Sequence, residues 1–311
     1  MMLAFVFPGQ GAQSVGMVSA LAAEFPQVRA RYDEASAVLG LDLWSLVDSG
    51  PAEQLNLTHN TQPALLAASV ATWDIWTALG GPRPMLLAGH SFGEYSALVC
   101  SGALDYRDAV ALVADRGRYM QDAVPAGAGG MAAVLGLEQA ACAAACAAAA
   151  DVGVAQCANL NAPGQIVISG AAAAVTRAGE LAREAGAKRV VPLAVSVPAH
   201  SALMRPAAER FATRIAPIQL RSPEIPVVHN VDLASHAAAD DIRAALVAQL
   251  YSPVRWQETI EQFAAKGVTQ VVECGPGKVL APLVKRCAAG IEVLSLNGPA
   301  ELRAALSSLG V

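Results

Sequence analysis

Short apolar runs alternate with amphipathic stretches in the first third of the chain. Leu3–Phe7 and 85–88 are unbroken apolar runs, and a turn containing glycine follows each of them. Unbroken apolar runs of this length indicate strands that are buried on both faces. Helical spacing comes next in both places, so the pattern predicts an α/β core with a parallel sheet. Further elements of this core are expected as helices at 14–25, 27–39, 62–79, 92–100, 242–250, 260–266 and from 278 onward, and as strands at 227–231 and 268–273.

The section from 126 to 197 has a pattern of its own. It opens with Gly127, Gly129 and Gly130, and an Ala-rich helical stretch follows its first apolar run. Its elements are expected as strands at 131–135, 152–158, 165–169 and 189–195, and as helices at 138–150 and 171–185. The order strand, helix, strand, strand, helix, strand is that of the ferredoxin-like arrangement. We therefore expect a ferredoxin-like small subdomain at 126–197, inserted into a core formed by 1–125 and 198–311.

Composition narrows the class of protein without identifying it. The 311 residues are 54% hydrophobic, which supplies enough apolar surface for a large core. Only 15% are charged and the net charge is -5, which excludes the basic surface of a nucleic-acid binder. The apolar stretch at 1–7 lacks a basic beginning and is too short for a signal peptide, and no later run is long enough to cross a membrane. We therefore expect a soluble protein that binds neither nucleic acid nor membrane.

The cysteines indicate a reducing compartment. The six cysteines are Cys100, Cys142, Cys146, Cys157, Cys274 and Cys287. No two of them form a C-x-x-C pair, and their spacing fits neither a disulfide framework nor a zinc site. Cys142 and Cys146 lie one helical turn apart in the Ala-rich stretch, where buried small apolar residues are the favoured interpretation. We expect reduced, structural cysteines, no bound metal and a cytoplasmic location.

The most informative segment follows the second apolar run and reads Gly89-His90-Ser91-Phe92-Gly93, a match to G-x-S-x-G. In this motif the glycines let the chain turn sharply between a strand and a helix, so that the serine hydroxyl stands clear of the backbone. The helix that begins there directs free N–H groups at the site, and the N–H of Phe92 can stabilise an oxyanion. An ordinary turn serine is the alternative, which the flanking strand and helix disfavour. Ser91 is therefore predicted to be a nucleophile.

A serine hydroxyl needs a base to remove its proton. The histidines available for this task are His59, His90, His200, His229 and His236. His90 is expected to point away from Ser91 on such a turn. His200 follows the last expected strand of the small subdomain, where the chain can return over the core. A partly buried histidine with satisfied hydrogen bonds is the alternative for each, and the pattern places His200 only slightly ahead.

Two glycine-rich segments nearly match nucleotide-binding motifs. The segment 9–14 resembles the dinucleotide fingerprint, but Ser14 stands at the position of its third glycine. Gly277-Lys278 fails as a P-loop because Val279 replaces the required serine or threonine. Neither segment supports a nucleotide-dependent enzyme.

Four segments together resemble a known family. They are 7–13, which reads FPGQGAQ; 89–98, which reads GHSFGEYSAL; 195–204, which contains His200; and 273–280. The family is that of the bacterial malonyl-CoA:acyl carrier protein transacylases, enzymes of fatty-acid synthesis. The resemblance runs from Leu3 to the last expected helices, with matching order and spacing. It implies an α/β-hydrolase-like core with a ferredoxin-like subdomain, in agreement with the pattern above.

The resemblance also implies roles for single residues. Ser91 matches the nucleophile that attacks the malonyl thioester, and His200 matches the base that later protonates the leaving thiol. Gln10 and Phe92 match the residues whose backbone N–H groups form the oxyanion hole. Arg116 matches the arginine that binds the free malonyl carboxylate, whereas outside the resemblance it would be interpreted as a solvated charge at a helix end. A guanidinium suits this task because it binds a carboxylate through two parallel hydrogen bonds and keeps its charge when desolvated.

No acidic residue is expected to orient His200. Ordinary α/β-hydrolases use an acid that lies between the serine and the histidine in sequence. The aspartates in that interval are Asp105, Asp108, Asp115, Asp122 and Asp151, and none stands where a triad acid is expected. The resemblance implies that a backbone carbonyl, here that of Gln249, accepts the Nδ1–H of His200 instead. Such a base is milder, which is adequate because a thiolate leaves readily.

Two positions depart from the usual pattern of the family. Phe92 stands where leucine is more frequent, and its ring would narrow or reshape the acyl pocket. Ala199 stands where a serine is common before the histidine. Residues around this histidine help to set acyl choice in related polyketide acyltransferases. Malonyl is nevertheless expected to be preferred over methylmalonyl.

The predicted reaction is a ping-pong transfer. Malonyl-CoA acylates Ser91, coenzyme A leaves, and the phosphopantetheine thiol of acyl carrier protein accepts the malonyl group. The resemblance implies a monomer with no bound cofactor, for which the coenzyme A thioester is a substrate. Basic pairs at 188–189 or 285–286 are candidates for docking the acidic carrier protein, although solvated surface charge is the favoured interpretation of each.

Three alternatives share parts of this pattern. A stand-alone acyltransferase that serves a polyketide synthase would carry every motif named above. A serine thioesterase or other hydrolase would share Ser91 and His200 but has no need of Arg116. A catalytically silent module that binds carrier protein is disfavoured because Ser91, His200, Arg116 and Gln10 are all intact.

Overall fold

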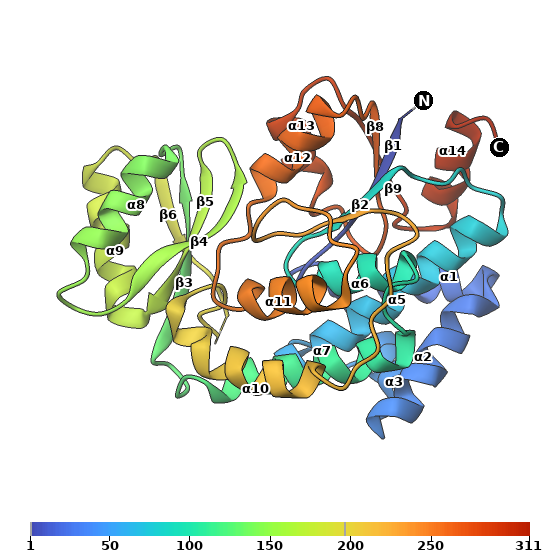
Figure 1. The fold of residues 1–311 in the computed structure, drawn as a ribbon, viewed down its shortest axis with the longest axis horizontal. Helices are drawn as coiled ribbons and strands as arrows, with labels where there is room; N and C mark the ends of the chain where they lie inside the picture. Colours follow the sequence, from blue (N-terminus) through green and yellow to red (C-terminus); the bar gives the residue numbers. More distant parts are fainter. Residues whose placement is uncertain (1, 196) are drawn as a thin grey trace.

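The computed structural model describes residues 2–195 and 197–311, and these residues form two sheets of different kinds. In the larger sheet all pairs of neighbouring strands are parallel, and the strand order is β7-β2-β1-β8-β9. The bounds of these strands are β1 Leu3–Phe7, β2 Leu86–Gly89, β7 Val227–Val228, β8 Gln270–Glu273 and β9 Glu292–Ser295. Figure 1 shows the smaller sheet at one end of the molecule and both chain termini at the other.

The central strand β1 explains why the parallel sheet is apolar on both faces. Leu3, Phe5 and Phe7 belong to one core cluster, and Ala4 and Val6 belong to another. Successive side chains of a strand point to opposite faces, so helices must cover both sides of this sheet. The first cluster is completed by α2 (Pro26–Leu39), α5 (Thr58–Ala78) and α7 (Tyr106–Asp122), and the second by α12 (Trp256–Ala265) and α13 (Ala281–Cys287). The predicted α/β core with a parallel sheet is confirmed.

The other helices of the core complete its outer layers. Their bounds are α1 Ser19–Glu24, α3 Leu43–Ser49, α4 Ala52–Leu55, α6 Gly93–Cys100, α10 Arg205–Ile215, α11 Ala239–Gln249 and α14 Pro299–Ser308, with a 3-10 turn at Ala202–Met204. Within the described residues, no helix combines the length and the apolarity that crossing a membrane requires.

The smaller sheet is antiparallel and has the strand order β4-β5-β3-β6. Its elements follow in the chain as β3 Gly129–Leu135, α8 Gln139–Ala148, β4 Ala155–Ala162, β5 Gln165–Ala171, α9 Ala172–Glu184 and β6 Arg189–Pro192. This is the predicted ferredoxin-like order, with both helices packed on one face of the sheet (Figure 1). The expected boundaries at 126 and 197 lie outside its first and last strands, so we propose the division into core and small subdomain on that ground.

Strand β4 begins and ends later than the sequence pattern indicated. The expectation was 152–158, whereas the strand runs over Ala155–Ala162. Its second half contains Asn159 and Asn161, which interrupt the apolar pattern from which the end of the strand was inferred. Hydrogen bonds between this half and Val254 of the core extend it, since the N–H of Leu160 donates to the Val254 carbonyl at 2.9 Å. The strand also pairs with β5 as far as Ala162 opposite Gln165, so its end is set by this pairing as well as by the contact with the core.

Other elements differ in extent or were not anticipated. Strand β6 ends at Pro192 although it was expected to reach 195, and residue 196 of the resembling segment 195–204 lies outside the described residues. The sequence pattern did not indicate α3, α4, α7, α10, α14 or β9. Helix α7 carries a signal that was available, because Asp105 caps it by accepting hydrogen bonds from the N–H groups of Arg107 and Asp108.

Candidate active site

The turn between β2 and α6 holds Ser91 in a strained conformation. Its φ is +53°, in the left-handed region that residues with a side chain rarely adopt. A Cβ at Gly89 would overlap the backbone of Gly93 and Glu94, and a Cβ at Gly93 would overlap the Phe7 carbonyl. Both glycines of the motif are therefore required by close backbone packing. The result is the sharp strand-to-helix turn that projects a serine side chain from the end of a parallel sheet.

Asn230 fixes this turn from behind. Its Oδ1 accepts a hydrogen bond from the N–H of Ser91 at 2.8 Å, and its Nδ2 donates to the Gly89 carbonyl at 2.7 Å. The side chain is fully buried. Asn230 follows β7, and no sequence signal linked it to Ser91 across 139 positions.

His200 lies beside the serine hydroxyl. Its Nε2 is 2.6 Å from Ser91 Oγ, and its Nδ1 is 2.8 Å from the backbone oxygen of Gln249. A carbonyl oxygen can only accept, so Nδ1 carries the proton and Nε2 is free to accept one from the serine. His200 also has a positive φ of 60°, and its N–H donates to the Leu250 carbonyl at 3.0 Å. The orientation of this imidazole is thus set jointly by the loop after the small subdomain and by the end of α11.

Burial keeps His200 neutral. Desolvation and, to a smaller extent, the positive charge of Arg116 lower its pKa to about 3, against the opposing effect of the Gln249 carbonyl. Only 2% of the surface of His200 is exposed to solvent. No acid takes the place of the Gln249 carbonyl, since Asp115 and Asp122 are paired with Arg214 and Arg210. The imidazole is therefore in its basic form at neutral pH.

Arg116 is a buried cation within reach of the nucleophile. It lies inside α7 and is 1% exposed, so the interpretation as a solvated charge at a helix end is wrong. Its Nη1 donates to Gln62 Oε1 at 3.0 Å and its Nη2 donates to Gln249 Oε1 at 3.0 Å. The same Nη2 lies 3.4 Å from Ser91 Oγ. Among residues 2–195 and 197–311, no carboxylate forms an ion pair with it. Desolvation lowers the pKa of this guanidinium.

A buried network links Arg116 to a carboxylate one step away. Gln249 Nε2 donates to Glu94 Oε2 at 2.8 Å and to the Ser91 carbonyl at 2.9 Å. Glu94 also accepts from the Asn230 N–H at 3.1 Å and contacts His229 Nδ1 at 2.5 Å. Burial lowers the pKa of His229, but the Glu94 carboxylate outweighs this effect and leaves that pKa raised. The sequence pattern had assigned no role to Gln62, Glu94 or Asn230, and it had considered His229 only as a candidate base.

Gln10 and Phe92 lie on the two turns that meet beside Ser91. Residue Phe7 pairs with Gly89, so the turn after β1 runs alongside the turn after β2. Gly9 packs so closely on this second turn that a Cβ there would lie 2.8 Å from the His90 carbonyl oxygen. Within the part of the chain that the structure describes, neither the Gln10 N–H nor the Phe92 N–H donates a hydrogen bond. Both groups are therefore available to a ligand.

The neighbouring side chains were only partly anticipated. His90 points away from Ser91, as predicted, and its Nε2 lies 2.8 Å from Asn161 Oδ1 of β4. The Phe92 ring is 1% exposed and belongs to the main core cluster, so it is packed away from solvent. Ala199 is partly buried between this cluster and residues of the smaller sheet.

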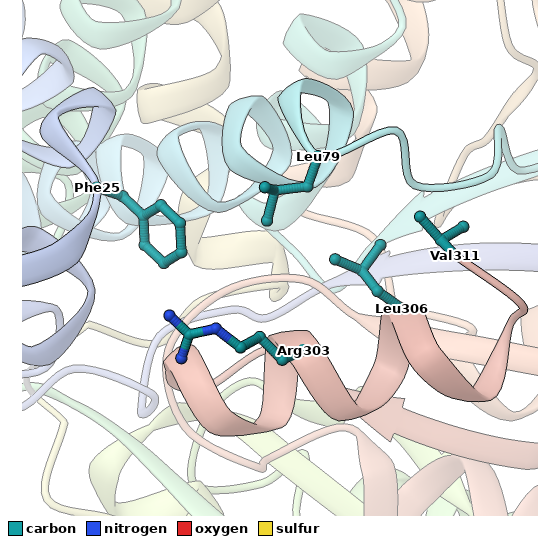
Figure 2. A pocket seen from close by; sticks show the side chains of 5 residues that line it. All are labelled: Phe25, Leu79, Arg303, Leu306 and Val311. Carbon is teal, nitrogen blue, oxygen red and sulfur yellow. The ribbon is translucent and has the colours of Figure 1, made fainter.

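A hollow separate from these residues lies elsewhere on the core. Figure 2 shows it between α5 and α14, and its lining consists of Phe25, Leu79, Arg303, Leu306 and Val311. Its volume is about 350 Å³. Arg303 is paired with Glu24, so its charge is already compensated. None of the residues around Ser91 lines this hollow, and we assign it no part in the candidate site.

Comparison with known proteins extends over nearly the whole chain. Residues 4–298 match the model of the acyl transferase domain family. A malonyl CoA-acyl carrier protein transacylase of Salmonella typhimurium is 54% identical over 304 residues, which are 98% of each chain. The protein of the same name from Bacillus subtilis is 45% identical over 308 residues, 99% of this chain and 97% of its own.

Solved structures agree with this assignment. The malonyl CoA-acyl carrier protein transacylase of Coxiella burnetii has a TM-score of 0.98 at 48% identity and covers 100% of this chain and 98% of its own. A malonyl-transacylase solved in complex with its type II polyketide synthase acyl carrier protein also has a TM-score of 0.98, at 50% identity, and covers 99% of this chain and 100% of its own. By sequence and by fold, the chain belongs to the acyl transferase family that includes the malonyl CoA-acyl carrier protein transacylases.

Proposed function

We propose that the protein transfers a malonyl group from malonyl-CoA to the phosphopantetheine thiol of acyl carrier protein, through an ester on Ser91, and so supplies fatty-acid synthesis. The observation that carries this proposal is the buried Arg116 guanidinium beside the nucleophile, which has no carboxylate partner among the described residues. A buried, unpaired charge is costly, and a substrate carboxylate relieves that cost. Of the acyl groups carried by coenzyme A, this site favours one that ends in a carboxylate.

In the first half-reaction Ser91 Oγ attacks the thioester carbonyl. His200 Nε2 accepts the hydroxyl proton across the 2.6 Å contact, and the carbonyl oxygen becomes an oxyanion. The N–H groups of Gln10 and Phe92 would stabilise that oxyanion. Collapse of the intermediate breaks the carbon–sulfur bond, and the proton held by His200 passes to the leaving thiol of coenzyme A. The product is malonyl-Ser91 with His200 neutral again.

The second half-reaction reverses these roles. The thiol of the carrier protein gives its proton to His200 Nε2 and attacks the ester carbonyl. The same N–H groups meet the second oxyanion, and the proton returns to Ser91 Oγ as the ester bond breaks. A carbonyl rather than a carboxylate accepts the hydrogen bond from His200 Nδ1, which leaves His200 a weak base. A weak base is sufficient because the overall reaction exchanges one thioester for another of similar energy.

Gln249 serves two parts of the site in this proposal. Its backbone oxygen orients His200, and its side-chain oxygen orients Arg116. Glu94 in turn fixes the Gln249 amide through Nε2. The base and the carboxylate-binding group are therefore positioned from one residue of α11.

The remaining expectations follow from this reaction. The coenzyme A thioester is the substrate, and the mechanism above uses only side chains and backbone groups of this chain. A cytoplasmic monomer is the state that we propose, in keeping with six free cysteines. The carrier protein would be an acidic partner, and Lys188, Arg189, Lys285 and Arg286 are exposed for contact with it.

A polyketide pathway and hydrolysis are the alternatives to be separated. The carrier protein in the solved complex belongs to a type II polyketide synthase, so a structural relative serves that pathway. A hydrolase would pass the acyl group of Ser91 to water, and the Arg116 contact gives it no advantage. Transfer and hydrolysis therefore predict different fates of the malonyl group on Ser91: passage to a carrier protein or loss to water.

Intact mass spectrometry tests the proposal directly. The protein is mixed separately with malonyl-CoA, acetyl-CoA and methylmalonyl-CoA without an acceptor, and a malonyl adduct that maps to Ser91 is expected. The adduct should disappear when holo acyl carrier protein is added and persist in buffer. The variant Ser91→Ala should carry no adduct. Label on that variant, or an adduct lost to water as quickly as to carrier protein, would contradict the transferase mechanism.

A further inference from the structure

Three thiols meet in the small subdomain, away from Ser91. The Sγ atoms of Cys142, Cys146 and Cys157 all lie within 4.8 Å of one another. In the part of the chain that the structure describes, this is the single group of three or more histidine, cysteine or acidic side chains that can surround an ion. Spacing in sequence did not indicate the group, because its third member comes from another element.

The fold brings these thiols together from a helix and a strand. Cys142 and Cys146 are four residues apart on α8, so they share one face of that helix. Cys157 belongs to β4, which packs beneath α8 in the core of the subdomain. Cys142 and Cys146 are 0% and 3% exposed, whereas Cys157 is only partly buried. The cluster is therefore largely shielded from solvent, and Cys157 is its most exposed member.

The size of the cluster suits a metal ion bound by sulfur. Metal–sulfur bonds of about 2.3 Å place neighbouring ligand sulfurs about 4 Å or less apart. The three thiols, at most 4.8 Å apart, need to approach by less than about 1 Å, which small side-chain rotations supply. A disulfide would use two of the three sulfurs and leave the third without a purpose. Packing as small apolar residues would account for burial, but not for three thiols converging from two elements.

The set of ligands determines the class of ion. All three ligands are sulfur, which favours soft ions such as Cu(I) over ions that prefer oxygen. Structural zinc sites take four protein ligands, and the group found among the described residues has three. Three sulfurs in an apolar setting match an ion of lower coordination number. We propose that Cys142, Cys146 and Cys157 form a thiolate site for a soft, thiophilic ion of low coordination number. The ion that we assign to it is Cu(I).

Binding would release thiol protons to solvent and connect α8 to β4. Strand β4 is the element that joins the subdomain to the active site, because Asn161 contacts His90 and Gln156 Nε2 donates to the His200 carbonyl at 3.3 Å. Successive residues of a strand face opposite sides, so Gln156 and Cys157 serve different neighbours. An ion in the cluster would thus stiffen the strand on which the His200 loop rests.

Anaerobic titration of the purified, reduced protein with Cu(I) tests this proposal. Competition against a chromogenic Cu(I) chelator should show one equivalent bound per chain, and Zn(II) in a parallel arm should bind more weakly. Cys157→Ala should lose more than about tenfold in Cu(I) affinity, since changes outside the ligand shell alone cost about that much. Cys287→Ala, which removes another partly buried thiol, is the matched control and should bind Cu(I) like the parent protein.

Folding of each variant is checked by its thermal unfolding and by malonyl transfer, neither of which requires the ion. Cu(I) affinity that is equal in the parent protein and in folded Cys157→Ala would overturn the proposal. So would an equal loss in Cys287→Ala, or failure of the parent protein to compete with the chelator at all. Tighter binding of Zn(II) than of Cu(I) would refute the assigned class of ion.

Discussion

Gln249 Oε1 accepts a hydrogen bond from Arg116 Nη2 at 3.0 Å, while the backbone oxygen of the same glutamine accepts one from His200 Nδ1. The orientation of the guanidinium and that of the imidazole therefore depend on one residue at the end of α11. Because α11 also follows the His200 loop in sequence and packs over the core, displacement of this helix would move both groups together.

Replacement of Arg116 should change substrate preference more than basal reactivity. In Arg116→Ala the malonyl carboxylate loses two charge-assisted hydrogen bonds of about 1.5–3 kcal/mol each, so kcat/KM for malonyl-CoA should fall about 10²–10⁴-fold. Acetyl-CoA has no carboxylate and should lose far less. Arg116→Lys should lie between these cases because a lysine cannot bind bidentately. Steady-state kinetics with both substrates measures the ratio, and an equal loss for both would contradict the assigned role.

Glu94 should act as a positioning residue for Gln249. Glu94→Gln keeps one acceptor oxygen but turns the other into an NH₂ donor, which must face either His229 or the donors Gln249 Nε2 and Asn230 N–H. We expect kcat to fall about 10- to 100-fold, equivalent to about 1.4–2.7 kcal/mol. Ser91 should still be acylated, but more slowly.

Glu273, the last residue of β8, offers a matched control for Glu94. Glu273 is a buried carboxylate that accepts hydrogen bonds from the N–H groups of Val279, Leu280 and Ala281. Glu273→Gln should lower thermal stability by a similar amount but leave the kcat of the folded fraction unchanged. If both variants lose kcat per folded molecule equally, Glu94 has a structural role only.

The reactivity of Ser91 should resist acid. A depressed pKa means that His200 stays neutral as the pH falls below the ordinary value of 6.5, and it gains a proton only near its own pKa of about 3. Inactivation by a neutral serine-directed sulfonyl fluoride, which avoids titration of the malonyl group, should therefore proceed at a constant rate from pH 8 to pH 5. A midpoint near 6.5 would show that His200 is more solvated than it is in this structure.

The same pKa has a consequence for stability, in a fixed direction. His200 takes up a proton in the unfolded chain near 6.5 but not in the folded chain until about 3. The free energy of unfolding should therefore fall as the pH is lowered between these values.

Replacing Arg116 by Gln removes a positive charge beside the imidazole, so the pKa of His200 should rise. The acid limb of the inactivation profile should therefore move to higher pH in that variant.

Backbone packing at the nucleophile turn should tolerate no side chain. In Gly93→Ala the added Cβ would meet the Phe7 and Pro8 carbonyl oxygens of the adjacent strand end. Because backbone atoms cannot move aside cheaply, the variant should lose about 1–3 kcal/mol or more of stability, together with its acyl-enzyme. Gly290→Ala, where a Cβ meets nothing, is the control and should keep both. Chemical denaturation measures the difference between the two variants.

The sequence by itself determined the features that local pattern records. The apolar runs at Leu3–Phe7 and Leu86–Gly89 form the central strands, because a strand covered on both faces must be apolar throughout. The G-x-S-x-G motif predicted the turn at Ser91, since only glycine satisfies the backbone packing on either side of it. The order of elements in the small subdomain was likewise recorded in the alternation of strand and helix patterns. Resemblance to a family then supplied Arg116, Gln10 and Gln249, which the local pattern had not singled out, and it supported His200, which the pattern had placed only slightly ahead of the other histidines.

Tertiary structure decided which distant polar residues meet. Gln62, Glu94, His229 and Asn230 come from elements spread over the whole core, and nothing in the spacing of a buried polar residue identifies its partner. The packing of α8 on β4 likewise brought Cys157 to Cys142 and Cys146. Arg116 shows the contrast most clearly, because its position in the chain is typical of a solvated helix and its charge is nevertheless buried. Local sequence fixes backbone conformation through sterics and periodicity, whereas the partner of a buried polar group depends on how complete elements pack.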